Sequence, residues 1–142
     1  MSRVVYFDVE MTGLNVKQDQ MISIGATMSD GPQVFQVFIN PTCPITVGAT
    51  RVHGMFHDND GNLRDKGNKI LYTVSIERAV HDFMDWLRGV QCKYLVAHNN
   101  LRFDWPILKR AVESFGYAHH WLLRKLVPVD SFVFMRQGMD LI

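Results

Sequence analysis

The chain has 142 residues, of which 47% are hydrophobic and 20% are charged, and its formal net charge is +1. This length and composition are typical of one globular domain with a single core. A net charge so close to zero gives no strong electrostatic footprint for nucleic acid, which argues against tight binding along a long stretch of duplex. No apolar run is long enough to span a membrane, and the carboxylates Asp8 and Glu10 interrupt the apolar N-terminal stretch, so we expect no signal peptide and no membrane partner.

The first predicted element is a β-strand from Arg3 to Val9 that leads into Glu10. Asp8 and Glu10 are two residues apart, and residues at this spacing project from the same face of a strand. Two adjacent like charges destabilise each other unless a cation lies between them, and carboxylate oxygens suit Mg²⁺ or Mn²⁺. The alternative is a solvated acidic pair at the end of a strand.

Two further strands follow, from Met21 to Met28 and from Val34 to Ile39, and a Ser-Asp-Gly turn signal separates them. With the first strand they predict an antiparallel meander. We expect loops at Pro41–Ala49, which holds two prolines, and at the polar segment His57–Lys69. The latter segment lacks the spacing of a calcium-binding loop, so a solvated loop is favoured.

The second half of the chain alternates helices and strands. Apolar spacing predicts a helix within Val74–Val90, a strand at Tyr94–His98 and a second helix at Phe103–Ser114, which Gly116 ends. A strand, helix and strand in this order predict parallel pairing through a right-handed crossover. The signal then weakens, and the remaining candidates are a helical turn at Trp121–Leu126 and a short strand at Val127–Val129.

Three motifs along the chain resemble those of the DEDDh 3′–5′ exonucleases. The run from Asp8 to Gly13 matches their D-x-E-T/M-T-G motif, and His98–Asp104 matches H-N-x-x-x-F-D. Between these two, Val52-His53-Gly54 is similar to the V/I-H-G turn of the family. The order and spacing of all three are far more specific than any one of them.

The resemblance implies an α/β fold of the ribonuclease-H-like kind, with the antiparallel meander and parallel strands in one mixed sheet flanked by helices. It also implies hydrolysis of phosphodiester bonds at the 3′ end of DNA or RNA by two divalent ions, Mg²⁺ or Mn²⁺. In the family pattern Asp8 bridges both ions, Glu10 holds the ion that carries the attacking water, and Asp104 acts through metal-bound waters. These three residues are the expected catalytic and metal-binding set.

The same resemblance predicts contacts with a single-stranded or frayed 3′ end. For Leu14 a place in the core is an equal alternative, and for Asn99 the alternative to a phosphate contact is a helix cap. We expect His98 to be a structural strand-end histidine and Phe103 to lie in the core. The full set of expected substrate contacts is Met11, Thr12, Gly13, Leu14, His53 and Asn99.

One part of the family pattern is missing. The third motif, H-x-x-x-x-D, supplies the general base and the last metal ligand, and its one occurrence, His53–Asp58, precedes the second motif. We therefore expect one domain over residues 1–142 that is incomplete at its C-terminus, and that cleaves slowly or not at all by itself because loss of a general base costs roughly 10²–10⁴-fold. A catalytically inactive module that binds nucleic acid or protein is the alternative function.

Two further expectations concern the surroundings of the protein. An incomplete domain would leave apolar surface uncovered, which predicts association with a second copy or with a partner on that side. Cys43 and Cys92 fit no metal-binding or disulfide framework, so we expect reduced thiols in the cytoplasm or nucleus. No signal in the sequence separates DNA from RNA as substrate.

Overall fold

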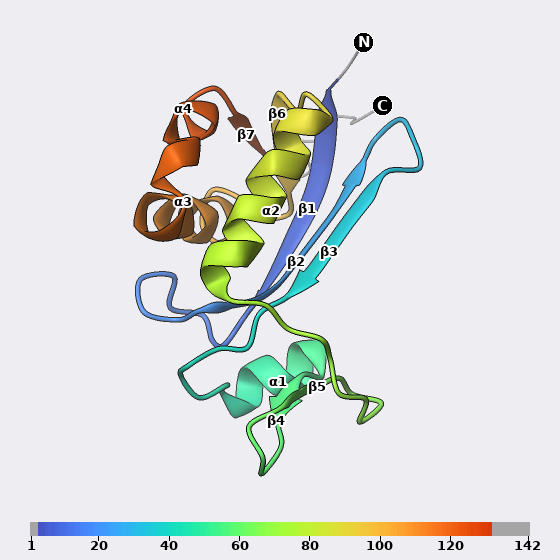
Figure 1. The fold of residues 1–142 in the computed structure, drawn as a ribbon, viewed down its shortest axis with the longest axis vertical. Helices are drawn as coiled ribbons and strands as arrows, with labels where there is room; N and C mark the ends of the chain where they lie inside the picture. The colour runs from blue at the N-terminus through green and yellow to red at the C-terminus, as the bar shows by residue number, and fades with distance from the viewer. Residues whose placement is uncertain (1–2, 132–142) are drawn as a thin grey trace.

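The computed structural model describes residues 3–131 (Figure 1). One five-stranded sheet forms its centre, and a small two-stranded sheet lies beyond the sheet's lower end with the first helix. None of the helices in this range is long and apolar enough to cross a membrane. The elements are β1 (Val4–Met11), β2 (Met21–Met28), β3 (Val34–Phe38), α1 (Val47–His53), β4 (Phe56–His57), β5 (Leu63–Arg64), α2 (Ile76–Gly89), β6 (Tyr94–Ala97), α3 (Asp104–Phe115), the 3₁₀ turn η1 (Tyr117–His119), α4 (His120–Leu123) and β7 (Val127–Asp130).

The strand order of the large sheet is β3-β2-β1-β6-β7. β1 pairs with β2, and β2 with β3, in antiparallel fashion, whereas β6 is parallel to both β1 and β7. The predicted mixed sheet, an antiparallel meander extended by parallel strands, is confirmed. β1 therefore lies in the middle of the sheet, and its carboxyl end points toward α1 (Figure 1).

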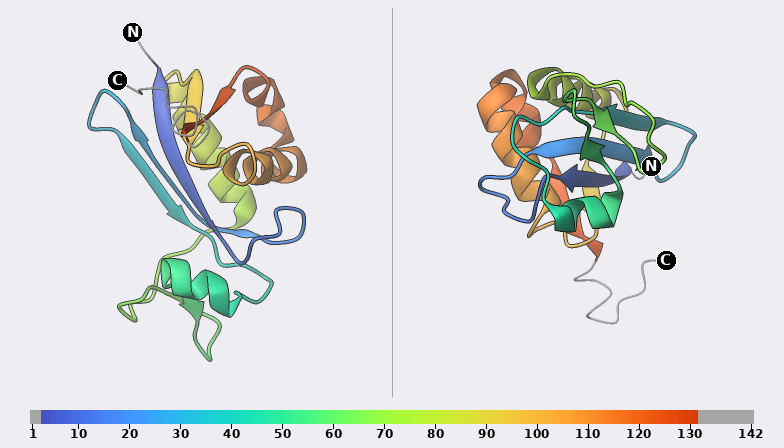
Figure 2. Two further views of the ribbon diagram at one scale, coloured as in Figure 1. Left: turned by 180° about the vertical axis from the view of Figure 1, so that it is seen from behind. Right: turned by 90° about the horizontal axis from the view of Figure 1, so that it is seen from below.

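The helices α2 and α3 form the main core with one face of the sheet. Ser75 caps α2 by accepting a hydrogen bond from the Arg78 amide, as Ser commonly does at this position. Phe83 of α2 is fully buried and its ring packs with those of Phe7 and Phe35. Figure 2 shows α2 and α3 on the same side of the strands when the molecule is seen from below. The opposite face of β1 is therefore free of these two helices.

Two predicted loops contain regular structure. Residues 41–49 were expected to be loop, but α1 begins at Val47, capped by the Thr46 side chain, which accepts from the Ala49 amide at 3.0 Å. The polar segment His57–Lys69 contains the β4–β5 hairpin except for its first residue, Phe56, and Asp58 stabilises this hairpin through a 2.6 Å ion pair with Arg64. α1 buries no residue, so it lacks the apolar periodicity that would have predicted it.

Other boundaries differ by one or two residues from the prediction. β1 continues through Glu10 to Met11, α2 covers Ile76–Gly89, and α3 begins and ends one residue later than expected. The predicted turn at Trp121–Leu126 is the short α4, which ends at Leu123. Residues 130–133 of the sequence also resemble a segment that follows the second helix in the exonuclease family, and the last two of these residues lie outside the described range.

Gly54 ends α1 in the left-handed conformation, with φ of 79°, and a Cβ atom there would lie 2.5 Å from the Cβ of Lys66. We expect Gly54→Ala to lower the free energy of unfolding by about 1–3 kcal/mol, because an L side chain is strained at this φ and meets backbone-proximal atoms. Gly48→Ala, in the interior of the same helix with open space around it, should be neutral or stabilising. Equal urea midpoints for the two variants would contradict this account.

Candidate active site

The candidate site lies at the part of β1 that is no longer paired with β6. β1 pairs with β6 only from Val4 to Tyr6, so the edge of β1 beyond Tyr6 is open on that side. α3 begins at this place, and its first residue, Asp104, fills the gap: its Oδ2 accepts a hydrogen bond of 2.9 Å from the backbone amide of Val9. Asp104 is 95 positions from Val9 in sequence, yet it lies against the residue between Asp8 and Glu10.

The two carboxylates of β1 share the face of the sheet opposite Val5 and Phe7, which are buried in the core. Asp8 is exposed and Glu10 is half-buried. Burial raises the pKa of Glu10 to about 7, and the Asp8 charge, a hydrogen bond with Asp8 and the Asp104 charge act in the same direction. The carboxyl group of Glu10 is therefore poised to bind or release a proton near neutral pH.

Asp104 is only 7% exposed. Burial raises its pKa to about 7 as well; the Val9 amide opposes this shift, and the charges of Asp8 and Asp130 add to it. Asp130, at the end of β7, is buried and accepts from the Leu101 amide at 3.3 Å. Asp130 was not among the expected site residues, although its place at the carboxyl end of a parallel strand was a usable signal.

The chemistry of this cluster fits a divalent cation. Carboxylate groups that repel one another and hold protons near pH 7 would exchange those protons for a cation, whose hard charge prefers oxygen ligands. The side-chain positions are not those of a completed coordination shell: among residues 3–131, no group of three His, Cys, Asp or Glu side chains is gathered closely enough to hold an ion. Asp8, Glu10 and Asp104 would supply the oxygens, and each would have to turn toward a common point.

A groove of about 280 Å³ lies beside Glu10. Its walls come from the end of β1, the loop after it, α1 and the residue before α3. The outermost wall residues are strongly exposed apolar side chains, with Leu14 at 85% and Val52 at 82%. Leu14 is therefore not a core residue, and Phe103, which was expected in the core, is half-buried and lines the groove. The lining residues are Val9, Glu10, Met11, Gly13, Leu14, Thr46, Gly48, Ala49, Val52, His53 and Phe103.

His53 connects α1 to the end of β1. Its Nδ1 accepts from the Met55 amide at 3.0 Å, so the proton of the neutral ring lies on Nε2, which donates to the Met11 carbonyl at 3.1 Å. Both ring nitrogens are thus used by the backbone, and His53 orders the groove rather than offering a base. Asp58, five positions on, is bound to Arg64 in the hairpin, and that ion pair lowers its pKa to about 2. The pair His53–Asp58 therefore does not act as a third motif.

The loop after β1 is held by Asp19. Thr12 is fully buried, and its hydroxyl donates to Asp19 Oδ1 at 2.9 Å, while Asp19 Oδ2 accepts from the Asn15 amide at 2.8 Å. A Cβ atom on Gly13 would lie 2.5 Å from Asp19 Oδ2, so the carboxylate packs directly against the glycine. Arg110 of α3 donates to the carbonyls of Val16 and Asp19, which fixes the loop to the helix layer.

We expect Arg110→Ala to free this loop. Hydrogen bonds from a charged donor contribute about 1.5–3 kcal/mol when buried, and because Arg110 is only half-buried a local loss of about 1–2 kcal/mol is expected. Amide exchange at Asn15 and Gln20 should accelerate roughly tenfold. Lys109→Ala, an exposed cation next to it on α3, serves as the control, and equal exchange in both variants would contradict the role of Arg110.

Asn99 and Asn100 shape the turn between β6 and α3. Asn99 has a left-handed backbone with φ of 56°, and α3 has no side-chain cap, so the alternative of Asn99 as a helix cap is wrong. Asn100 is fully buried and donates to the carbonyls of Leu95 and Val129, at 2.9 and 3.1 Å. Asn100, which sequence reasoning missed, thus ties the turn to β6 and β7. His98, expected to be a structural strand-end residue, is exposed.

Comparison with known proteins identifies the family of the chain. Residues 5–134 match the family of exonucleases defined as RNase_T, and the chain belongs to this family. The resemblance to exonucleases found from the motifs is thereby confirmed. The class of protein that the fold defines is therefore a domain of the exonuclease family.

Two curated relatives are each 30% identical. The match to the PolC-type DNA polymerase III of Caldanaerobacter subterraneus subsp. tengcongensis covers 79% of this chain and 7% of that protein, over 115 residues. The match to the chloroplastic/mitochondrial exonuclease DPD1 of Arabidopsis thaliana covers 96% of this chain and 41% of that protein. The chain thus spans less than half of the length of either relative.

Among solved structures, the fold is similar to that of exonuclease I. The apo structure superposes with a TM-score of 0.74 over 96% of this chain and 30% of that chain, at 15% sequence identity. The structure of E. coli exonuclease I in complex with a dT13 oligonucleotide also has a TM-score of 0.74. At this identity the likeness establishes the ribonuclease-H-like fold alone.

Proposed function

We propose that this chain carries out metal-dependent 3′–5′ exonuclease chemistry of the DEDDh type, with Asp8, Glu10 and Asp104 as its metal ligands. The observation that carries the proposal is the 2.9 Å hydrogen bond from the Val9 amide to Asp104, because it brings the second motif to the first. When bound, divalent ions would lower the pKa of the attacking water and neutralise charge on the leaving oxygen.

The chain's own residues would position the substrate. The apolar wall of the groove, with Leu14 and Val52, would take the terminal base, and the backbone of Thr12 and Gly13 would follow its sugar. His53 would keep α1 and the end of β1 at a fixed separation through its bonds to Met11 and Met55. Asn99, next to the start of α3, is proposed to contact a phosphate.

The alternative function, a module that binds nucleic acid without cutting it, is favoured by one observation. No residue of the sequence is assigned as the general base. Both ring nitrogens of His53 are hydrogen-bonded to the backbone, and the sequence contains no other H-x-x-x-x-D string. The raised pKa values of Glu10 and Asp104 favour the catalytic alternative, since perturbed carboxyl groups gather at reacting sites.

A cleavage assay separates the two functions. Single-stranded DNA and RNA oligonucleotides with a 5′ label would be incubated with the chain and Mn²⁺ or Mg²⁺, with EDTA as the metal control. The proposal predicts a ladder that shortens one nucleotide at a time from a free 3′ end, and no shortening of the same oligonucleotide when the 3′ end is blocked. Binding without shortening at high protein concentration would establish the non-catalytic module, and cutting of the blocked substrate would refute the 3′–5′ direction.

The compartment and association of the protein are also proposed. Cys43 and Cys92 are free thiols, which favours a reducing compartment inside the cell. The relative from Arabidopsis is named for chloroplasts and mitochondria, so an organelle is an alternative to the cytoplasm and nucleus. Association with a second copy or a partner stays a prediction.

A further inference from the structure

The segments that lead into β6 and β7, at the end of the sheet opposite the groove, are basic, although the chain as a whole is nearly neutral and the neighbouring turn between β2 and β3 carries Asp30. Residues 86–97 and 114–129 contain no Asp or Glu, but they contain Lys93, Arg124 and Lys125, and also Arg88, which pairs with Asp85 at 3.3 Å. β6 and β7, which belong to these segments, are adjacent parallel strands. Parallel strands begin at the same edge of a sheet, so the charges that precede β6 and β7 lie together.

Backbone contacts place a third cation there. The Val127 amide donates to the Lys93 carbonyl at 2.8 Å, and the Lys93 amide donates to the Arg3 carbonyl at 2.9 Å. Arg3, Lys93 and Lys125 therefore lie at the amino ends of three neighbouring parallel strands, β1, β6 and β7. In Figure 1 this edge of the sheet is at the top, and α1, which forms one wall of the groove, is at the bottom.

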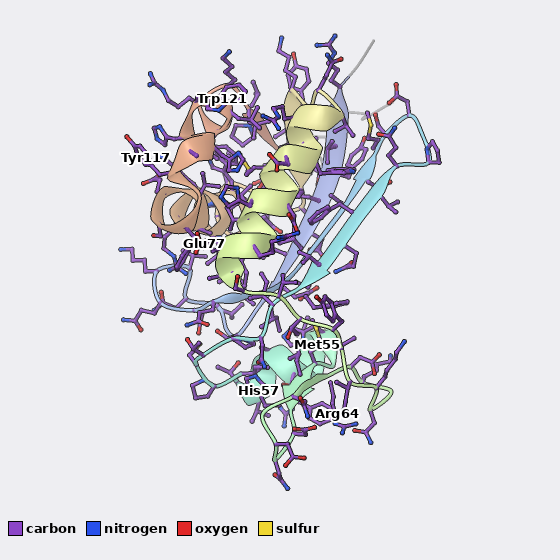
Figure 3. All side chains as sticks on the ribbon, in the orientation of Figure 1. Met55, His57, Arg64, Glu77, Tyr117 and Trp121 are labelled. Atoms are coloured by element: carbon purple, nitrogen blue, oxygen red, sulfur yellow. The ribbon has the colours of Figure 1, made fainter. Side chains whose placement is uncertain are left out.

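Exposed aromatic rings accompany these cations. Trp121 is 47% exposed with the Lys125 Nζ atom 5.3 Å from its ring, and Tyr94 is 36% exposed with Lys93 Nζ at the same distance. Tyr117 is 75% exposed and stacks on His120, at 5.5 Å between ring centroids. Figure 3 shows Tyr117 and Trp121 at the outer side of the α4 segment. We call this set, Arg3, Lys93, Tyr94, Tyr117, Trp121 and Lys125, the basic–aromatic surface.

We propose that the basic–aromatic surface is a second binding site for single-stranded nucleic acid, which holds a part of the strand several nucleotides away from the 3′ end in the groove. A single strand offers phosphates to the cations and flat bases to the exposed rings, and proteins that bind single strands combine these two features. An acidic peptide or an anionic membrane would satisfy the charges but has no flat bases to stack on the rings.

The distance between the two sites sets the length of strand required. The eight residues of β1 separate them, which corresponds to about 25 Å at ~3.3 Å per residue. An oligonucleotide too short to cover this distance can occupy only one site. This inference rests on the proposed function in one respect, namely that the groove receives the 3′ end.

The test is binding measured by fluorescence anisotropy in EDTA, so that cleavage cannot interfere. We expect Trp121→Ala to weaken binding of a 20-nucleotide single strand by about fivefold or more, the equivalent of one lost base-stacking contact, and to leave binding of a trinucleotide unchanged. Lys125→Gln should reduce the salt dependence of log Kd by about 0.7, one phosphate contact. Tyr72→Ala and Lys69→Gln, an exposed tyrosine and an exposed lysine outside both sites, should bind both lengths like the wild type.

Two results would overturn the proposal: unchanged affinity and salt dependence in Trp121→Ala and Lys125→Gln, or stronger binding of a polyglutamate peptide or anionic vesicles than of the 20-nucleotide strand. The results also distinguish a failure of the proposed exonuclease function from a failure of the proposed second binding site. Loss of binding in Trp121→Ala without any cleavage by the wild type would refute the exonuclease function alone. Shortening of the oligonucleotide with unaltered binding by Trp121→Ala would refute the second site alone.

Discussion

Asp8→Asn is expected to reduce Mg²⁺-dependent shortening of a single-stranded oligonucleotide to the level seen without protein. Asp8 interacts with both of the other carboxyl groups, since its charge raises the pKa of Glu10 and that of Asp104. Its removal would take away a ligand common to both proposed ions. Bound metal supplies several kcal/mol of transition-state stabilisation and each 1.36 kcal/mol is tenfold in rate, so a loss of about 10²–10³-fold is expected.

A matched variant makes this result specific. Asp30 is an exposed aspartate in the turn between β2 and β3, so Asp30→Asn changes the net charge equally and leaves the site intact. Both variants would be compared with the wild type at high protein concentration, because the wild-type rate is expected to be low. Retention of most of the wild-type activity by Asp8→Asn would show that cleavage does not depend on this cluster.

Asp104→Asn is expected to stabilise the chain at alkaline pH and to have little effect at acid pH. The folded state holds the Asp104 proton up to a pKa of about 7, whereas the unfolded chain releases it near 3.8. Stability that is present below pH 3.8 is therefore lost as the pH rises through 7. The shift corresponds to an upper value of about 4 kcal/mol, so the variant should be about 2–4 kcal/mol more stable than the wild type at pH 8 without metal.

The measurement is urea unfolding of the two proteins at pH 4.5, where these pKa values leave a difference of only about 1 kcal/mol, and at pH 8. An asparagine can still accept the hydrogen bond from the Val9 amide, so the substitution removes the charge and keeps the contact. His119, whose pKa is lowered by burial and by His81, makes stability fall below pH 6.5, but it affects both proteins equally. Mn²⁺ should stabilise the wild type at pH 8 more than it stabilises the variant, which keeps Asp8 and Glu10. An equal difference between the proteins at both pH values would refute the raised pKa.

The part of the fold that could be predicted is the part that buries apolar surface. Apolar spacing from Ile76 to Leu87 predicted α2, and the buried residues of that helix include Ala79, Val80 and Phe83. α1 could not be found in this way because it buries nothing; its only signals are Thr46 at the start and Gly54 at the end. The β4–β5 hairpin has two residues per strand, which is too short for any periodicity.

The candidate site was likewise predicted from the sequence only in part. The spacing of Asp8 and Glu10 follows from the geometry of a strand, and the motif containing Asp104 predicted a turn into a helix. Local pattern could not show that Asp104 replaces a strand neighbour of Val9, because that bond depends on where β6 diverges from β1. The burial that raises the pKa of Glu10 and Asp104 is likewise a property of the assembled fold.

The most direct test of a metal site at the end of β1 is a Mn²⁺ titration followed by NMR, because the paramagnetic ion broadens the signals of nearby amides. At substoichiometric Mn²⁺ the amides of Val9, Glu10, Met11 and Asp104 are predicted to broaden first, and Asp8→Asn should abolish this selectivity. Broadening that is uniform, that centres on Asp58 and Asp60 of the hairpin, or that persists unchanged in Asp8→Asn would contradict the account.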